Sequence, residues 1–382
     1  MQTVTVRPRE PSITDSTEQL LPPFSLAVIS VLFFLSAAVI VPEVSADDSI
    51  RYTADVTRLP VGTDIAAMGD IGVALPRRAV SAVWNPAAAA LLEQYEVSME
   101  GADLYQHLSQ HGCFAGAVPL KNRLGAVLSY QPFYSGRINL YDTIPEATGF
   151  NGLTVHSPRG FMRNYHHLVN LSFAGYYPLQ FPRVAGTNLP IPIDLSAGIN
   201  MKVYAQTMMP GGQMYLGMGY NADVGLLARI GIDYDIATNM HHRQLCVGAT
   251  LRDVLPSSVI WMSYSDKQLY YSPERYREPF HFAQYYGVTY IDQSGALFAD
   301  WVLGIGLIKE YEVTYHGGIE ATFWDMASFR AGISGKTPTV GAGFRYRRLF
   351  IDYAFRFEEI AFSVVRLTIG VVLPVLGVPA GE

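Results

Sequence analysis

The sequence predicts an all-β protein, namely a transmembrane antiparallel β-barrel of about fourteen strands with a small N-terminal plug segment. Three observations predict this fold: an export signal, long period-two alternation of apolar and polar residues, and few charges. Only 16% of the residues are charged and 49% are hydrophobic, whereas a soluble domain carries about 25% charged residues. We therefore expect that water is not the only solvent around this chain.

Residues 1–46 are expected to be a signal peptide. The uncharged apolar run Phe24–Val41 is followed by Val44-Ser45-Ala46, a small-residue pattern typical of cleavage sites. The alternative is that the run stays as a membrane anchor, although it is at the short end for a spanning helix. Cleavage near Ala46 would give a mature chain that begins at Asp47, exported to the bacterial outer membrane.

Residues 47–93 precede the first expected strand and lack long alternation, so we predict that they form a plug, or hatch, in the barrel. Within them, Asn85 and Pro86 favour a turn, and the following alanines can continue as a short helix. In a lumen, the Asn85 side chain can hydrogen-bond backbone groups that would otherwise lack partners. The alternative from the residues alone is a plain capped helix before the first strand.

Residues 94–374 are predicted to form the barrel. From Ile191 to Ala205, the odd positions from 193 onward are apolar and several even positions are polar, over more residues than the usual strand of about five or six. Such a length suits a tilted strand that crosses a bilayer. A soluble sandwich would also alternate, but its outer face would carry more charge. We therefore expect Ile199 and Val203 to face lipid and Asn200 to face the lumen.

An even number of strands places both termini at the periplasmic rim. The two longest connections, about Gln131–Asn164 and Asp253–Arg277, then fall on the extracellular side, where long loops belong. Residues 375–382 are expected to be a C-terminal tail. The fourteen strands are expected to begin near Gln94, His111, Arg123, Tyr165, Ile191, Gly219, His242, Phe280, Leu297, Glu312, Ala327, Thr339, Leu349 and Phe362.

The plug segment also resembles a known family. Its residues "MGDIGVALPRRAVSAVWNPA", from Met68 to Ala87, resemble the N-terminal hatch of the FadL-like outer-membrane transporters and, more closely, the PorV/PorQ family. The C-terminal stretch "VGAGFRYRRLFIDYAFRF" is similar to the penultimate strands of PorV-like proteins. Asp70 and Ile71 depart from the small residues that the family usually has there. The resemblance implies a non-enzymatic barrel whose hatch motif consists of Gly69, Gly72, Trp84, Asn85, Pro86 and Ala87.

No catalytic residues, metal ligands or cofactors are expected. His166 and His167 are adjacent, so on a strand they point to opposite faces, and His316 and Glu320 on one strand face are roughly 13 Å apart, too far to chelate one ion. The set His167, Asn170 and Ser172 has the residue types of a lipase-like site, but these types are also ordinary on a polar lumen wall.

The two cysteines, Cys113 and Cys246, fall on the second and seventh expected strands. These strands are not neighbours in a barrel of fourteen. We therefore expect both to remain small, packed free thiols.

The resemblance to PorV/PorQ implies, as the main expectation, an outer-membrane component of a type IX-like secretion machine that contacts exported proteins. The alternatives are a FadL-like channel for hydrophobic small molecules such as long-chain fatty acids, and a structural or adhesive barrel. The net charge of −6 gives no reason to expect a nucleic-acid partner. Aromatic residues of the seventh connection are candidate contacts for a protein or a hydrophobic ligand, or alternatively pack at the barrel rim. They are Trp261, Tyr264, Tyr270, Tyr271 and Tyr276.

Overall fold

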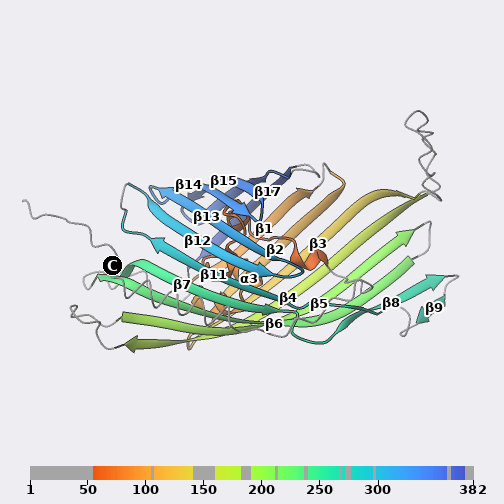
Figure 1. The fold of residues 1–382 in the computed structure, drawn as a ribbon, viewed down its shortest axis with the longest axis horizontal. Helices are drawn as coiled ribbons and strands as arrows, with labels where there is room; N and C mark the ends of the chain where they lie inside the picture. Colours follow the sequence, from red (N-terminus) through yellow and green to blue (C-terminus); the bar gives the residue numbers. More distant parts are fainter. Residues whose placement is uncertain are drawn as a thin grey trace, which may run out of the picture. The chain divides into compact units, whose positions relative to one another are not determined.

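The fold is described by a computed structural model (Figure 1). The described residues are 55–104, 107–140, 160–181, 191–210, 214–235, 240–265, 268–271, 277–295, 298–358 and 363–374. The expected signal peptide, residues 47–54 and the expected tail at 375–382 therefore lie outside the described residues. In the described part of the chain, no helix has the length and apolar character needed to cross a membrane.

Five short helical turns come first, followed by strands. The turns are η1 (Asp55–Arg58), α2 (Thr63–Ala67), η2 (Gly72–Ala74), α3 (Ser81–Trp84) and η3 (Pro86–Leu91). The strands are β1 (Tyr95–Leu104), β2 (Ser109–Pro119), β3 (Leu124–Leu140), β4 (Gly160–Phe181), β5 (Ile191–Pro210), β6 (Met214–Asp235), β7 (Met240–Arg252), β8 (Ser258–Ser265), β9 (Gln268–Tyr271), β10 (Arg277–Pro279), β11 (Ala283–Asp292), β12 (Asp300–Lys309), β13 (Val313–Phe323), β14 (Ala327–Ser334), β15 (Thr337–Tyr346), β16 (Leu349–Arg356) and β17 (Val364–Leu373).

Fourteen of these strands, β1 to β7 and β11 to β17, form a closed antiparallel barrel. Successive strands pair along the chain, β7 pairs with β11, and β17 closes the barrel on β1. We call the rim where β1 begins and β17 ends, with Tyr95 opposite Leu373, the near rim, and the opposite one the far rim. This confirms the predicted fold class. The strand starts agree closely with the expected ones, the largest differences being Gly160 for Tyr165 and Met214 for Gly219.

The seventh connection differs from the expected loop because it contains β8, β9 and β10. β6 has 22 residues and β7 only 13, so β7 covers β6 from Val224 onward and leaves its far-rim half without that partner. β8 takes its place and pairs with Met214–Met218. The seventh connection therefore extends the barrel wall, so that this part of β6 is not left as an unpaired edge. In the third connection, β3 and β4 also extend further than expected, to Leu140 and from Gly160.

The outer wall is apolar, as the alternation in β5 predicted. Ile199 and Val203 are 44% and 54% exposed, whereas Asn200 between them is 1% exposed. Large apolar side chains are exposed in the same way on the other barrel strands, among them Leu128, Phe173, Leu226, Ile305 and Ile369. Because a closed barrel pairs its backbone groups internally, such a surface is suited to hydrocarbon, and the chain is a transmembrane β-barrel.

The segment before β1 lies inside this barrel and touches opposite walls. α2 contacts β14 to β17, η2 contacts β7 and β11, and η3 contacts β2 to β6. In Figure 1 its orange turns lie among the strands. From Val61 to Leu92, all but Pro76 and Arg77 are buried. We refer to residues 55–93 as the plug segment.

Candidate functional site

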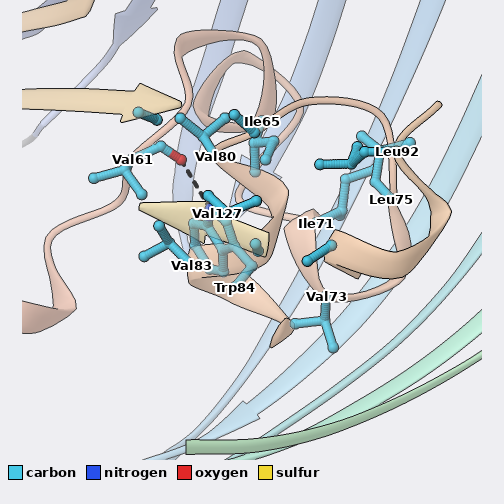
Figure 2. Close-up of a cluster of buried hydrophobic side chains, with 14 of the residues drawn as sticks. Val61, Ile65, Ile71, Val73, Leu75, Val80, Val83, Trp84, Leu92 and Val127 are labelled. Carbon is cyan, nitrogen blue, oxygen red and sulfur yellow. Dashed lines mark hydrogen bonds between the residues drawn. The ribbon is translucent and has the colours of Figure 1, made fainter. Parts of the chain in front are cut away.

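The plug segment has its own apolar core, which continues into the wall. Figure 2 shows Val61, Ile65, Val80, Val83 and Trp84 packed together, with Val127 of β3 against them. The indole Nε1 of Trp84 donates to the carbonyl oxygen of Val61 at 2.8 Å, which ties the two ends of the segment. The Trp84 ring also lies 6.1 Å from the ring of Tyr285 on β11. Trp84 therefore connects two parts of the plug segment with each other and also contacts the barrel wall.

Asn85 uses its whole side chain to fix the turn after α3. Its Oδ1 accepts from the N–H of Ala87 at 3.1 Å, which caps η3, and Pro86 occupies the first turn of that helix. Its Nδ2 donates to the carbonyl oxygens of Val73 and Leu226, at 2.9 and 3.0 Å. Since Leu226 belongs to β6, one buried amide joins η2, η3 and the wall. The alternative of a plain helix cap describes only the first of these bonds.

Gly69 and Gly72 serve close packing. Gly69 has φ +71°, and a Cβ there would lie within 3.0 Å of backbone atoms of Gly317 and Ile333 on β13 and β14. At Gly72, a Cβ would lie within 3.0 Å of the Trp84 ring. A side chain larger than hydrogen is therefore excluded at both positions, by the wall at Gly69 and by the tryptophan at Gly72.

The barrel wall also has glycines at the points where the plug segment approaches it, which the sequence analysis did not predict. At eight strand glycines, an added Cβ would lie within 3.0 Å of an atom of the plug segment. Several of them are direct cross-strand partners, so they form a belt around much of the lumen. Glycine inside a strand marks a close backbone approach; here the approaching chain is the plug segment. The glycine belt consists of Gly125, Gly198, Gly225, Gly248, Gly304, Gly318, Gly332 and Gly341.

On the side of β13 to β16, charged side chains hold the plug segment. Arg77 bonds Glu320 of β13 through Nη1 at 2.5 Å and Asp64 of α2 through Nη2 at 3.0 Å. Glu320 also accepts from Arg330 of β14, and Arg330 bonds Asp352 of β16 at 2.6 Å. We call Asp64, Arg77, Glu320, Arg330 and Asp352 the latch. Removing one partner from such a buried network is destabilising, because the remaining charge is then buried without compensation.

Asp64 belongs to the plug segment and is wholly buried. Burial by itself raises the pKa of this carboxyl, but attraction to Arg77, Arg78 and Arg330 outweighs it, so its pKa is held below the usual value. Asp64 therefore stays ionised inside the lumen at neutral pH.

Asp70, one of the two departures from the family pattern, is also engaged. Its Oδ2 accepts from Ser334 Oγ at 2.6 Å and from Arg356 Nη1 at 3.0 Å. Ile71, the other departure, places its Cδ1 where a side chain on Gly304 would stand. Both residues therefore add contacts between the plug segment and the wall.

The plug segment extends further than the expected periplasmic part of the barrel. Arg58 donates to the carbonyl oxygen of His281 at 2.6 Å and lies 3.8 Å from Glu310, and both partners follow or precede strand ends at the far rim. Val56 and Leu59 pack against buried apolar wall clusters. The plug segment therefore extends from the near-rim mouth, where Leu91, Leu92 and Glu93 line the cavity, to strand ends at the far rim.

On the far side of the plug segment lies an apolar and aromatic cluster, which we call the far-side cluster: Leu168, Tyr204, Val259, Trp261 and Phe280. Val56 of η1 packs against it. The rings of Tyr204 and Phe280 meet edge to face with centroids 6.1 Å apart.

Trp261 is packed rather than exposed, as in the alternative of packing at the barrel rim: it is only 8% exposed, and its Nε1 donates to Glu278 at 2.9 Å. It turns inward because β8 is part of the wall rather than a free loop. Tyr264 lies on β8, Tyr270 and Tyr271 lie on β9, and Tyr276 falls outside the described residues. Of the five candidate contacts, only Trp261 is therefore shown within the far-side cluster.

The ladder between β2 and β3 is interrupted. β2 and β3 pair in a single register except at Gly112/Pro132 and Cys113/Gln131. Pro132 has no N–H to donate to a ladder. At the lumen side of the same place, His111 and Gln131 are each 3% exposed, and neither ring nitrogens nor amide atoms have a hydrogen-bond partner. This place therefore combines two missing ladder pairs with buried polar atoms that have no partner in the protein.

The near-rim mouth contains a cavity of about 510 Å³ whose lining includes Arg77 and Arg78 of the plug segment. Arg345, Arg347 and Arg348, at the end of β15 and in the turn to β16, also line it. Arg78 is 5% exposed and lies with its guanidinium 3.5 Å from the centre of the Phe350 ring. The mouth is thus lined by several guanidinium groups.

The residues weighed for catalysis are not brought together. His166 is buried and bonds Tyr204 at 2.6 Å, whereas His167 is exposed on the outer face and bonds Tyr130. Asn170 and Ser172 face the lumen, so His167 shares no site with them. Cys113 and Cys246 are free and buried, as expected. Across the described ranges, no group of three or more His, Cys, Asp or Glu side chains could hold a metal ion.

Comparisons with known proteins found likeness only among solved structures; no family model and no curated protein matches the chain. The Ralstonia pickettii toluene transporter TbuX has 10% identity and a TM-score of 0.45, over 82% of this chain and 97% of that one. The P. putida toluene transporter TodX has 11% identity and a TM-score of 0.42, over 82% and 98%. CymD, a monoaromatic hydrocarbon channel, has 8% identity and a TM-score of 0.42, over 84% and 98%. Because these TM-scores lie below 0.5, the likeness carries no conclusion about the function of this chain.

Proposed function

We propose that this protein is an outer-membrane channel for hydrophobic small molecules, closed by its internal plug segment. The observation that carries the proposal is the far-side cluster, a buried group of apolar and aromatic side chains against which Val56 of the plug segment packs. The inner wall also carries buried polar side chains, among them Asn170, Asn200 and Lys202. Ligand sites combine an apolar lining with a few placed polar groups, and this part of the lumen has that composition.

The polar groups next to the far-side cluster are fixed in position. Tyr204 lies at 2.6 Å from His166 Nδ1 and donates to Gln206 at 2.8 Å. Lys202, one inward position nearer the plug segment, is bound between Asp223 and Asp253 at 2.6 and 2.5 Å. Since these groups satisfy one another, an apolar ligand would meet the rings and not a free charge. Val56 covers the cluster, so the ligand would take the place of this side chain.

The interruption between β2 and β3 supports a route for such a ligand. Apolar solutes partition into the bilayer, and a wall with unmade ladder bonds opens at less cost than a complete one. At this place Gly112 and Pro132 face outward, while His111 and Gln131 face the lumen. We propose that the ligand exchanges between lumen and membrane here, past His111 and Gln131.

Ligand binding tests the proposal. Purified protein in detergent is titrated with toluene and, separately, with a long-chain fatty acid, and tryptophan fluorescence is followed. We expect saturable quenching that is lost in Trp261→Phe, which keeps an apolar ring but removes the reporter, and weakened affinity in Phe280→Ala. Phe173→Ala, a matched change of an exposed outer-wall phenylalanine, should leave affinity unchanged. Equal affinities of Phe280→Ala and the unchanged protein would exclude the far-side cluster as the site.

A second candidate is a component of a type IX-like secretion machine, as the resemblance to PorV/PorQ implies. What supports it is the hatch motif itself, from Gly69 to Ala87, and the aromatic residues carried by β8 and β9. The two candidates differ in phenotype. Deletion of the gene should alter the set of exported proteins if the secretion role holds, and should slow uptake of an apolar substrate with an unchanged set of exported proteins if the channel role holds.

We also propose the maturation of the chain: a signal peptide of residues 1–46, a plug of residues 47–93, the barrel of residues 94–374 and a tail of residues 375–382. The short apolar run Phe24–Val41 and the small-residue triplet before Asp47 support cleavage. N-terminal sequencing of the membrane-extracted protein should read from Asp47. A sequence that starts upstream of Phe24 would instead support an uncleaved anchor.

A further inference from the structure

The near-rim mouth contains arginines that have no carboxylate partner. Arg345, Arg347 and Arg348 are exposed, and no ion pair joins any of them to an acid in the described part of the chain. All three line the same cavity of about 510 Å³. Single exposed arginines are ordinary, but three that flank one concavity concentrate guanidinium donors whose planar fork matches oxyanions.

The plug segment adds positive charge behind them. Arg77 and Arg78 line the same cavity as Arg345, together with Asp352 and Glu320. Arg78 has only a 3.5 Å contact with Asp352 through Nη2, and its Nε and Nη1 are buried without a hydrogen-bond partner. A buried guanidinium with unused donors is unfavourable until an acceptor reaches it. The floor of the mouth therefore attracts negative charge.

The lining also contains carboxylates, which offset part of this positive charge: Glu93, Glu96, Asp300, Glu320, Asp325 and Asp352. Glu320 and Asp352 are bound to Arg77 and Arg330 within the latch. Asp300 begins β12, and Asp325 lies in the turn between β13 and β14, close enough for their two negative charges to repel each other. An incoming anion would be repelled from that edge and drawn to the turn between β15 and β16.

We propose that the near-rim mouth binds an oxyanion, a phosphate or carboxylate group, through Arg345 with Arg347 and Arg348, in the positive field of Arg77 and Arg78. The bound group bridges the barrel wall and the plug segment, because Arg345 belongs to β15 and Arg78 to the plug segment. The site lies on the opposite side of the plug segment from the far-side cluster and does not rest on the proposed transport of apolar molecules. Its anion is either a soluble molecule or the headgroup of an acidic lipid.

The test is calorimetric titration of inorganic phosphate into the full mature protein in phosphatidylcholine nanodiscs at low salt. We expect one phosphate per chain, weakened by added salt. Arg345→Ala should lower the affinity about tenfold or more, the loss of charge-assisted hydrogen bonds, and Arg345→Lys should retain part of it. The control is Arg163→Ala, an exposed arginine on β4 away from the mouth, which should bind as the unchanged protein does.

Two results would overturn the proposal: no phosphate binding by the unchanged protein, or equal binding by Arg345→Ala. The source of the anion is decided by repeating the titration in nanodiscs that contain phosphatidylglycerol. Unchanged phosphate affinity supports a soluble oxyanion as the ligand. A phosphate affinity that is lower in these nanodiscs than in phosphatidylcholine nanodiscs supports an acidic lipid headgroup as the occupant of the same arginines.

Discussion

Gly318 on β13 and Met68 in the plug segment are in backbone contact: a Cβ on Gly318 would lie within 3.0 Å of the carbonyl oxygen of Met68. The contact repeats at other members of the glycine belt, where plug backbone lies directly on strand backbone. The plug segment therefore fits against the wall because glycines leave room for its backbone there.

Gly318→Ala should displace the plug segment. The added methyl group has no space, and overpacking of this kind costs about 1 to 3 kcal/mol. We expect a lower melting temperature of the folded band in heat-modifiability gels and a higher conductance in planar bilayers. The matched control is Gly101→Ala on β1, where an added Cβ has no atom within 4 Å. If both variants behave alike, the glycine belt does not seat the plug segment.

Ile199→Arg or Val203→Arg should impair assembly, because both side chains face outward on β5. The expected cost of arginine near the bilayer midplane is about 2 to 4 kcal/mol, read as loss of heat-modifiable protein from the outer membrane. Asn200 is no suitable control, because it is 1% exposed and bonds Asp223 and Ser172. Ser328→Arg, at a residue that lines the near-rim mouth, should be tolerated. Equal tolerance at Ile199 and Ser328 would contradict the lipid-facing assignment.

Glu320→Gln should loosen the latch. It leaves Arg77 and Arg330 facing a neutral amide, and Arg330 is buried with 2% side-chain exposure. Breaking one partner of a buried pair costs about 3 kcal/mol or more, so we expect a lower melting temperature and intermittent channel openings. Glu312→Gln, an exposed glutamate between β12 and β13, is the control. Closed, stable channels in both variants would mean that the latch contributes nothing to closure.

The plug segment should keep the lumen closed at neutral pH and should release it only at acidic pH. The pKa of Asp64 is lowered in the seated plug segment, so its contribution to stability is complete above the usual aspartate value of about 3.9 and is lost as the pH falls through the lowered value. Conductance should therefore stay low from about pH 8 to about pH 5 and rise below about pH 4. Asp64→Asn should leak at neutral pH. A rise between about pH 7 and pH 5 would point to histidine rather than to Asp64 as the group that holds the plug segment.

The sequence was sufficient for the barrel because strand alternation is local: the facing of Ile199, Asn200 and Val203 follows from their own order along the chain. It was sufficient for Asn85 as well, since an Asn-Pro turn and an Asn cap are local features. It could not reveal that Arg77 bonds Glu320, because the two are joined only by closure of the barrel. A strand glycine such as Gly225 reads as a weakness until the plug segment is placed against it. The burial of Trp261 could not be read from the sequence, because its surroundings depend on the length of β6, which leaves room for β8 in the wall.

The central claim is that the plug segment closes the lumen, and deletion of Gly69–Ala90 tests it most directly. The variant is first checked for a heat-modifiable folded band in the outer membrane and is then measured in planar bilayers beside the unchanged protein. A barrel of fourteen strands is too wide for side chains alone to fill. We therefore predict a folded barrel with raised ion conductance. A folded barrel whose conductance equals that of the unchanged protein would contradict the account, since other residues would then seal the lumen.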